Sequence, residues 1–215
     1  MPTELLIIGT GGMAREAAQL ARQIDPAATR WSSVSFVTED PSQLGKKLSV
    51  GEVRLTDAFL LQKEEPTDVV IGIGHPKVRQ RIAQWLTSIP QLSFPNLIHP
   101  AVEIDYGRVS LGRGNIVTRG VIMTLDIAIG DFNIFNWNTT VGHDVRVGSY
   151  NVINPACNLS GFAEIGDMCL LGAGAQVLEH ISITNSVIVG AGAVVTRTLN
   201  EVGTYIGIPA RLLKC

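Results

Sequence analysis

Charged residues are scarce in this sequence, and their two signs nearly balance. Asp, Glu, Lys and Arg make up 17% of the 215 residues, and the net charge at pH 7 is −2. A nucleic-acid-binding surface needs a clear excess of basic residues, so the composition gives no reason to expect nucleic acid as a partner. A low charged fraction is typical instead of a chain in which many residues line a narrow parallel β core.

Long apolar runs and paired cysteines are also missing. The longest early apolar run, Leu5 to Ile8, is too short for a signal peptide or a membrane span. Of the three cysteines, Cys157 and Cys169 fall on inward-facing positions of the repeat described next, so we expect packed thiols and no disulfide or metal site there. Cys215 is terminal. Together these features fit a cytoplasmic enzyme.

What the sequence does contain is a strict six-residue repeat. Every sixth residue from Leu111 to Val195 is apolar, which gives 15 hexads in register. Four residues further on, most hexads carry a second, smaller apolar residue, and only Asn115, Asn133 and Asn151 are strongly polar there. An α-helix cannot keep this register because six is not close to a multiple of 3.6. The repeat therefore predicts short parallel strands, three to a coil, in a five-coil triangular prism that rises about 4.8 Å per coil.

Glycine recurs directly after the large residue of many hexads. We expect these glycines at the corners of the prism, where the chain turns and needs a permissive backbone. The positions are Gly112, Gly130, Gly142, Gly148, Gly166, Gly172 and Gly190.

A different pattern precedes the repeat. Leu5 to Ile8 is predicted to be a buried strand, and a glycine-rich turn and a helix over 14–24 follow it. Further strands are expected over 34–37 and 68–73, and a second helix opens at Pro76 and reaches about Leu86. This order indicates a small Rossmann-like α/β domain over 1–95, followed by an all-β repeat domain over 96–215.

The glycine-rich turn would bring backbone N–H groups and a helix N-terminus close to a phosphate. The spacing of Gly9, Gly11 and Gly12 lacks the third glycine of a dinucleotide fingerprint, and Arg15 stands nearby in place of a small residue. The domain is also short for a complete dinucleotide-binding fold. Three interpretations stay open: a ligand-free tight turn, an NAD site, and a site for a nucleotide-sugar diphosphate.

The pairing of these two domains, together with five local motifs, resembles the hexapeptide-repeat nucleotide-sugar acetyltransferases that make bacillosamine and N-acetylperosamine. The sequence is similar as well to the sialic acid O-acetyltransferases. The resemblance covers nearly the whole chain. The motifs are the glycine turn, the acidic pair Glu39-Asp40, Ile71-Gly72-Ile73-Gly74, Val141-Gly142-His143-Asp144 and Gly207-Ile208-Pro209-Ala210-Arg211.

The resemblance implies a left-handed parallel β-helix, a homotrimer with its prisms side by side, and acetyl-CoA as co-substrate. It also implies that the α/β domain holds a nucleotide-linked sugar. The substrate-binding residues would be Gly9, Thr10, Gly11, Gly12, Met13, Glu39, Asp40 and Gly74. The residues alone leave a simpler interpretation of Glu39 and Asp40 open, a solvated turn before Pro41.

Two positions depart from the family pattern. Met13 stands where the amino-sugar enzymes commonly carry a histidine near the acceptor amine, and Val152 stands where some relatives carry a second histidine. The first departure leaves open whether an amine or a hydroxyl is acetylated. A sialic acid-type sugar O-acetyltransferase is therefore the alternative.

By resemblance, His143 is the general base and the adjacent Asp144 orients its ring; from its position alone, His143 would be an ordinary surface histidine. An aspartate at a corner also bonds to turn amides, which is the simpler interpretation of Asp144. One coil later, Gly161 is expected to let the thioester approach and to offer its N–H to the oxyanion. The resemblance places coenzyme A along Ala173 and Ala191; with Gly161, the other expected cofactor contacts are Pro209, Arg211 and Lys214. For Arg211 and Lys214, a solvated tail is the other possibility.

Three other classes of protein compete with an acetyltransferase. A zinc enzyme of the γ-carbonic-anhydrase type needs three converging histidines, and His143 and His180 are separated by two coils, so no metal site is expected. A noncatalytic scaffold fits poorly with unbroken hexads and the His143-Asp144 pair. A NAD-dependent oxidoreductase would need a fuller glycine fingerprint.

Overall fold

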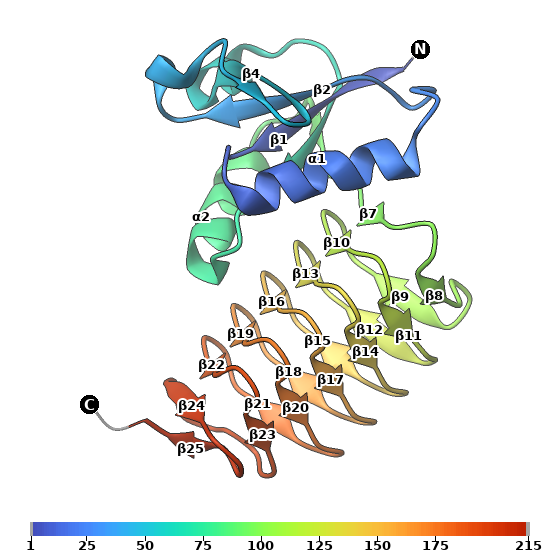
Figure 1. The fold of residues 1–215 in the computed structure, drawn as a ribbon, viewed down its shortest axis with the longest axis vertical. Coiled ribbons are helices and arrows are strands. Elements are labelled where there is room, and N and C mark those ends of the chain that lie inside the picture. Colours follow the sequence, from blue (N-terminus) through green and yellow to red (C-terminus); the bar gives the residue numbers. More distant parts are fainter. Residues whose placement is uncertain (1, 214–215) are drawn as a thin grey trace.

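The computed structural model describes residues 2–213, and in it an α/β domain packs against one face of a long triangular prism, over the first coils (Figure 1). The α/β domain has a six-stranded sheet in the order β3-β4-β2-β1-β5-β6, parallel except for the β3–β4 pair. Its strands are β1 (Thr3–Ile8), β2 (Trp31–Thr38), β3 (Lys47–Leu48), β4 (Gly51–Thr56), β5 (Thr67–Ile71) and β6 (Leu92–Ser93). Its helices are α1 (Gly12–Ile24), α2 (Pro76–Leu86) and the 3₁₀ turns η1 (Pro41–Gln43) and η2 (Asp57–Gln62).

The α/β domain confirms the predicted strand and helix order and adds elements that the sequence did not reveal. The apolar run at Leu5–Ile8 is the buried centre of β1, as expected. β2 is longer than the predicted strand over 34–37, and the β3–β4 hairpin and η2 were not anticipated because their segments carry no clear apolar period. Between residues 2 and 213, no helix has the length and apolar character needed to cross a bilayer.

The prism has three flat faces, each a ladder of short strands. Face 1 contains β7 (Leu97–Ile98), β10 (Ile116–Val117), β13 (Ile134–Phe135), β16 (Val152–Ile153), β19 (Leu170–Leu171), β22 (Ile188–Val189), β24 (Thr204–Ile206) and β25 (Arg211–Leu212). Face 2 contains β8 (Glu103–Ile104), β11 (Ile122–Met123), β14 (Thr140–Val141), β17 (Asn158–Leu159), β20 (Gln176–Val177) and β23 (Val194–Val195). Face 3 contains β9 (Val109–Leu111), β12 (Ile127–Ile129), β15 (Arg146–Val147), β18 (Glu164–Ile165) and β21 (Ser182–Ile183).

The hexad repeat sets both the register and the interior of this left-handed β-helix. Strands pair in parallel with a partner 18 residues away, for example Ile116 with Ile134 and Val117 with Phe135. The large residue of each hexad points inward and, from Val117 to Val195, is buried. The smaller inward residues include Cys157 and Cys169, which are free thiols. Burial raises the pKa of each of these thiols to about 11, so both are unreactive packing residues.

The corner glycines serve a different purpose from the one expected. The left-handed backbone falls three residues after the large hexad residue, at every sixth position from Gly114 to Gly192, and most of these positions are not glycine. The glycines that follow the large residue have no positive φ and are instead required by space. A Cβ on Gly130, for example, would lie 2.5 Å from Ser149 Oγ and 2.8 Å from the carbonyl oxygen of Gly148 in the next coil.

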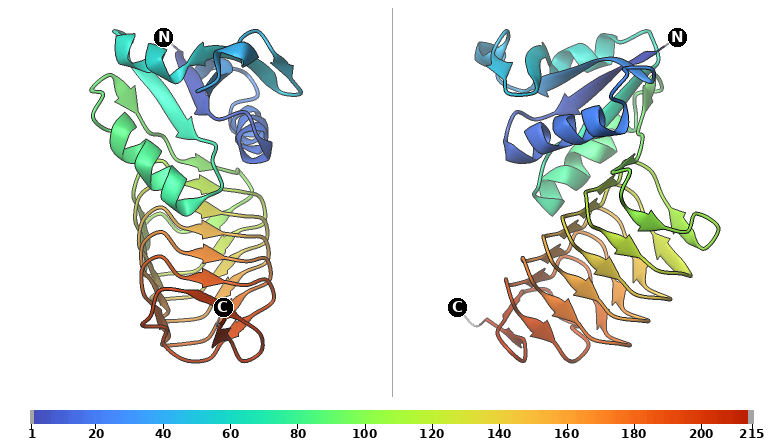
Figure 2. Two further views of the ribbon diagram at one scale, coloured as in Figure 1. Left: turned by 90° about the vertical axis from the view of Figure 1, so that its left-hand side faces the viewer. Right: turned by 45° about the vertical axis from the view of Figure 1, so that its right-hand side comes forward.

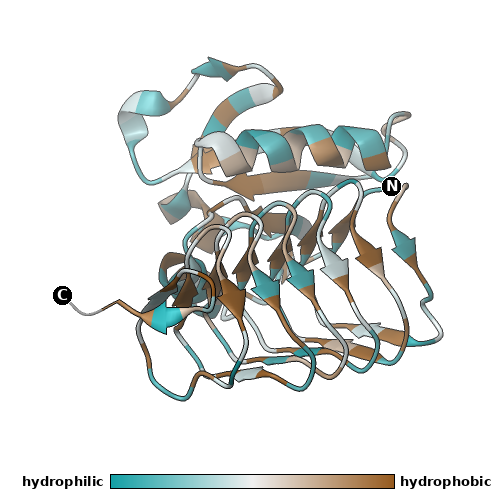
Figure 3. Ribbon diagram, turned by 60° about the horizontal axis from the view of Figure 1, so that its bottom comes forward, coloured by the Kyte–Doolittle hydropathy of each residue, from teal (hydrophilic) through white to brown (hydrophobic). Residues whose placement is uncertain are grey.

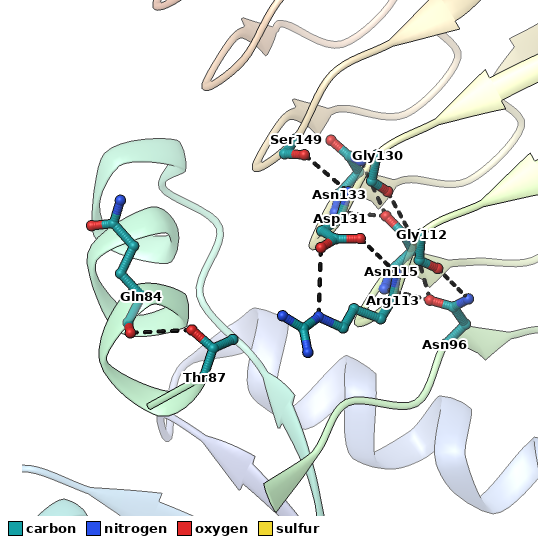
Figure 4. Close-up of polar contacts among 10 residues, drawn as sticks. All are labelled: Gln84, Thr87, Asn96, Gly112, Arg113, Asn115, Gly130, Asp131, Asn133 and Ser149. Carbon is teal, nitrogen blue, oxygen red and sulfur yellow. Dashed lines mark hydrogen bonds and ion pairs between the residues drawn. The ribbon is translucent and has the colours of Figure 1, made fainter. Parts of the chain in front are cut away.

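The three polar residues that interrupt the inward pattern form a ladder at the edge between faces 3 and 1, and Figure 4 shows its first part, from Asn96 to Asn133. Asn115 donates to Asn96, and Asn133 donates to Asn115, from both the backbone N–H and the side-chain amide. Asn133 and Asn151 continue the ladder as acceptors for the backbone N–H groups of Asn151 and Cys169. Buried asparagines are tolerated here because each side-chain oxygen accepts a hydrogen bond from the next coil, although Nδ2 of Asn151, the last of them, has no partner among residues 2–213.

Face 1 carries the α/β domain. The outward residues Leu97, Ile116, Ile134 and Val152 are buried in one apolar cluster with the small side chains of α1, such as Ala17. Helix α1 lies across the strands of face 1 in two views (Figures 2 and 3). The edge between faces 2 and 3 is therefore the edge of the prism that lies opposite the α/β domain.

Candidate active site

His143 and Asp144 lie at the edge between faces 2 and 3. His143 Nδ1 is 3.0 Å from Asp144 Oδ2, and the two side chains keep 49% and 39% of their surface exposed. Asp144 occupies one of the left-handed corner positions (φ 60°), a conformation that aspartate tolerates better than most residues. With Nδ1–H donated to the carboxylate, Nε2 of His143 is free to accept a proton.

Gly161 lies directly against the His143 ring, as the 18-residue period predicts. A Cβ at this position would be 2.7 Å from Cε1 and 2.8 Å from Nε2 of His143. The imidazole can therefore rest on the backbone of the next coil only because residue 161 has no side chain. The free nitrogen of the ring and the backbone of Gly161 face the same small space.

Phe162 and His180 complete the surroundings of the base. The ring of Phe162 meets His143 edge-on at 5.3 Å and stacks on His180 at 4.7 Å. His180 is exposed, as expected of a surface histidine, but this aromatic stack was not anticipated. The signal was present in the sequence, because 144, 162 and 180 are successive corner positions 18 residues apart. Beside the stack lies a pocket of about 340 Å³ lined by Asp144, Arg146, Phe162, Glu164, His180 and Ser182.

Backbone amides are satisfied differently at the three edges of the prism. At the edge between faces 3 and 1, corner side chains accept them: Asp131 Oδ1 accepts from the N–H of Arg113 (2.9 Å), and Ser149 Oγ from that of Asp131 (3.0 Å). Asp167 and Asn185 continue this series in the next coils. At the other two edges, the N–H groups of Gly161, Ala173 and Ala191 have no acceptor among residues 2–213. These edges present donors to a ligand.

The predicted cofactor residues form a column at the edge between faces 1 and 2. Ala173, Ala191 and Pro209 are spaced by 18 residues and all are exposed. Arg211, on β25, is exposed near the end of the prism, whereas Lys214 lies outside the described residues. The structure brings Gly161 together with His143 but places the alanine column on the opposite edge of face 2.

A cavity of about 880 Å³ opens in the α/β domain at the carboxyl ends of its strands, where ligands bind in parallel sheets. Of the predicted substrate residues, it is lined by Gly9, Thr10, Gly11, Glu39 and Asp40. Gly12, Met13 and Gly74 do not line it. Other residues of the wall include Gln43, Asp57, Ile73, Val78, Arg81, Ile82 and Trp85.

One wall of this cavity is fixed by internal hydrogen bonds. Asp40 accepts from the N–H and hydroxyl of Ser42 and from Nε2 of Gln43, and these bonds hold the pKa of its carboxyl below the usual range. Gln43 in turn accepts from the Thr10 hydroxyl at 3.0 Å. Asp40 and Thr10 therefore shape the wall. Glu39, with no hydrogen bond to residues 2–213, keeps its carboxylate available for a ligand.

The wall supplied by α2 was missed in the sequence. Val78, Ile82 and Trp85 follow the i, i+4, i+7 spacing of one helix face and give the cavity an apolar side, and Arg81 adds its one cationic side chain. The helical spacing could have been noticed, but it predicts only a shared face. Whether that face meets a core or a cavity depends on the neighbouring strands.

Met13 lies at the start of α1 and is half-buried. Its side chain packs against the apolar cluster that joins α1 to face 1. Met13 is therefore a packing residue. Within the described part of the chain, no three His, Cys, Asp or Glu side chains are grouped so that they could hold a metal ion.

Gly161→Ala is expected to lower kcat by roughly 10- to 100-fold, because a misplacement of the reacting groups by about 1 Å can cost that much. The added Cβ would push the imidazole off its resting place, as the short distances to Cε1 and Nε2 show. Steady-state kinetics measure the effect. Gly192→Ala is unsuitable as a control because its φ is positive. Gly107→Ala is suitable, because Gly107 is exposed, has no positive φ, and a Cβ there would meet only Asp105 Oδ1, at 3.2 Å; it should leave kcat unchanged. Unchanged turnover in Gly161→Ala would contradict the prediction.

Comparisons with known proteins agree with both domains. The family described as PglD N-terminal domain matches residues 4–86, and the bacterial transferase hexapeptide family (six repeats) matches residues 162–197. A search of curated protein sequences finds no match.

Solved structures match over the whole chain. PerB from Caulobacter crescentus, in complex with CoA and GDP-perosamine, is 30% identical, with a TM-score of 0.88 over 98% of this chain and 97% of PerB. The acetyltransferase domain of PglB from Neisseria gonorrhoeae FA1090, in complex with acetyl coenzyme A, is 25% identical, with a TM-score of 0.90 over 99% and 100% of the two chains. WeeI from Acinetobacter baumannii AYE is 26% identical, with a TM-score of 0.86 over 98% and 100%. With this identity and coverage, the chain belongs to the hexapeptide-repeat nucleotide-sugar acetyltransferases and is an acyltransferase.

Proposed function

We propose that this enzyme transfers the acetyl group of acetyl-CoA to an amine or hydroxyl of a nucleotide-activated sugar. The observation that carries the proposal is the free Nε2 of His143, held by Asp144 and resting on Gly161 at an edge with unpaired amides. The cavity in the α/β domain supplies the nucleotide site, with the N-terminus of α1 and Arg81 for phosphates and Glu39 for donor groups of the nucleoside. CoA and GDP-perosamine bound to the related PerB support both ligands.

In the proposed mechanism His143 acts as general base in one direct attack. Nε2 takes the proton from the acceptor as its nitrogen or oxygen forms a bond to the thioester carbon. The N–H of Gly161 donates to the oxyanion, the C–S bond then breaks, and the imidazolium returns its proton to the departing thiolate. The carboxylate of Asp144 stabilises the positive charge of the imidazolium. Among residues 2–213, no hydroxyl or thiol makes a hydrogen bond with the His143 ring, which supports transfer without an acyl-enzyme.

The geometry of a single chain supports a homotrimer. His143 lies on the edge opposite the α/β domain, so a sugar held in the cavity of one chain is remote from the base of that chain. The alanine column lies across face 2 from His143, a span of six residues or roughly 20 Å of extended chain. If face 2 of each copy faces a threefold axis, His143 of one copy meets Ala173 and Ala191 of the next. One shared groove then receives acetyl-CoA, and Pro209 and Arg211 continue it toward the phosphates.

A hydroxyl acceptor is the second candidate. Met13 packs between α1 and the prism and offers no proton acceptor near the sugar, whereas the family's histidine would serve an amine. This supports the sialic acid-type sugar O-acetyltransferase as the alternative substrate chemistry. Treating the product with hydroxylamine, which cleaves an acetyl ester but not an acetamide, and following the loss of the acetyl group by mass spectrometry separates the two.

The free thiols support a cytoplasmic location for the enzyme. Cys157 and Cys169 are free and buried, which is usual for proteins kept in a reducing environment. We therefore place the enzyme in the cytoplasm, where its acetyl-CoA would also be supplied. Fractionation of the native host tests this placement.

The cavity is expected to bind at least one nucleotide sugar and to show no tight binding of NAD. Calorimetry with UDP-, GDP-, dTDP- and CMP-sugars measures this. Arg81→Ala should weaken binding by roughly 10- to 100-fold, the value of a charge-assisted hydrogen bond, while Arg22→Ala on α1 should not. Tight NAD binding without a response to any nucleotide sugar would overturn the proposed function.

A further inference from the structure

We propose that Arg79 is a positioning residue for acetyl transfer: it fixes the nucleotide cavity relative to the prism by joining α2 to backbone carbonyls of both domains. The inference rests on the proposed function and deepens it. It concerns a fully buried side chain that neither the mechanism nor the nucleotide cavity uses.

Arg79 spans the junction of the two domains with four hydrogen bonds to carbonyl oxygens. In the α/β domain, Nη1 donates to Ile71 (2.6 Å) and Ile73 (3.2 Å), at and just beyond the end of β5. In the prism, Nε donates to Phe132 (2.5 Å) and Nη2 to Gly114 (3.4 Å). Phe132 and Gly114 are left-handed corner residues one coil apart at the edge between faces 3 and 1. The guanidinium thus donates hydrogen bonds to two successive coils on one side and to the end of β5 on the other.

The cation has no counter-ion among residues 2–213, and its surface is entirely buried. Burial lowers the pKa of the Arg79 guanidinium to about 9, which reflects the cost of removing it from water. An apolar side chain of the same volume would join the two domains without that cost. Packing alone does not need a charge. We therefore attribute the presence of an arginine here to its directional hydrogen bonds, because four N–H donors in a rigid guanidinium allow one relative orientation of the two domains.

Helix α2 transmits this orientation to the substrate. One of its faces carries Val78, Ile82 and Trp85 into the wall of the nucleotide cavity. The neighbouring face of the helix buries Arg79 and packs Leu86 into the cluster that contains Phe132. Ile73, whose carbonyl accepts from Arg79, also lines the cavity. A shift of α2 on the prism therefore moves the bound nucleotide by the same amount.

The position of the cavity matters because the acceptor has to meet a base carried by the prism of another copy. A displacement of about 1 Å at the reacting atoms can lower the rate roughly 100-fold. Binding of the nucleotide within the α/β domain does not need the prism. Binding of acetyl-CoA along the prism does not need the α/β domain. Substitution of Arg79 should therefore affect how the two bound ligands are placed relative to each other, but should not change the affinity for either ligand.

The test uses Arg79→Met, which keeps the volume and removes every hydrogen bond, and Arg79→Lys, which keeps the charge with fewer and less rigid donors. We expect kcat to fall at least tenfold in Arg79→Met and by a smaller factor in Arg79→Lys. The Kd of the nucleotide sugar and the KM of acetyl-CoA should stay within twofold of wild type. Gln84→Ala, an exposed position on the same helix, is the matched control and should change nothing. Assays are run well below each protein's Tm.

The outcomes separate a positioning role from a structural one. Folded variants with wild-type kcat would overturn the inference, and so would a parallel loss of kcat, nucleotide affinity and Tm. If even Arg79→Lys does not fold, Arg79 is a folding determinant and the inference is wrong. Failure of the proposed function would show differently, as wild-type protein that binds no nucleotide sugar or transfers no acetyl group.

Discussion

His143→Ala is expected to lower kcat by roughly 10²- to 10⁴-fold, the usual contribution of a positioned general base. The ring contributes little to the surface along Ala173 and Ala191, so the Kd of acetyl-CoA should change less than twofold. Thiol release from acetyl-CoA gives the rate, and calorimetry gives the affinity. A folded variant with near wild-type turnover would show that the base lies elsewhere or that none is required.

Two variants make this result specific. Asp144→Asn keeps a residue that tolerates the left-handed corner and a side-chain oxygen that can still accept from Nδ1–H, but it removes the negative charge. Its loss should therefore be smaller than that of His143→Ala. His75→Ala removes an exposed histidine of the α/β domain that makes no capping bond, and it should leave kcat unchanged.

Mixing two inactive variants is expected to restore activity, because the proposed site takes His143 from one copy and the alanine column from the next. Ala173→Trp would fill the cofactor groove with an indole, and His143→Ala would remove the base. After co-expression and random assembly, about a quarter of the sites pair an intact base with an intact groove. The mixed protein should therefore recover about a quarter of wild-type kcat, from near zero for either variant alone.

The control for complementation is a double variant. His143→Ala with Ala173→Trp in one chain, co-expressed with wild type, should leave activity proportional to the pairs of neighbouring wild-type chains. Light scattering should give a trimer for every protein. A concentration-independent monomer, or no recovery in verified mixed trimers, would place the complete site within one chain and remove the argument for the shared groove.

The β-helix could be predicted from the sequence because every coil of a prism needs apolar side chains at the same inward positions. Leu111 to Val195 alternate with smaller residues for one geometric reason, so the period, the 18-residue register and the approach of Gly161 to His143 all follow from counting. The corner chemistry did not follow. A glycine in the sequence suggests a left-handed backbone, but Gly130 is needed because a Cβ there would collide with Ser149 of the next coil. The left-handed positions carry Phe162, Asp144 and other side chains instead.

The residues that could not be predicted depend on contacts between segments far apart in the chain. Arg79 stands in an amphipathic helix among exposed Lys77 and Arg81, and its sequence neighbours give no sign that it is buried. Only the docking of α2 on Phe132 and Gly114 encloses it. Trp85 is similar, because its spacing on α2 indicates a face and the strand ends decide that the face borders a cavity.

Because the register is 18 residues, the prism lengthens in steps of one coil, each of about 4.8 Å. An insertion or deletion that is not a multiple of six residues would turn inward side chains such as Phe135 and Leu159 toward water. One of six or twelve residues would keep them inward but would move every later strand to a different face. A whole coil could be gained or lost while every ladder survives. The length of the cofactor edge, between faces 1 and 2, can therefore change in evolution only by whole coils. An enzyme of this kind can adapt to longer or shorter acyl carriers only in steps of one coil.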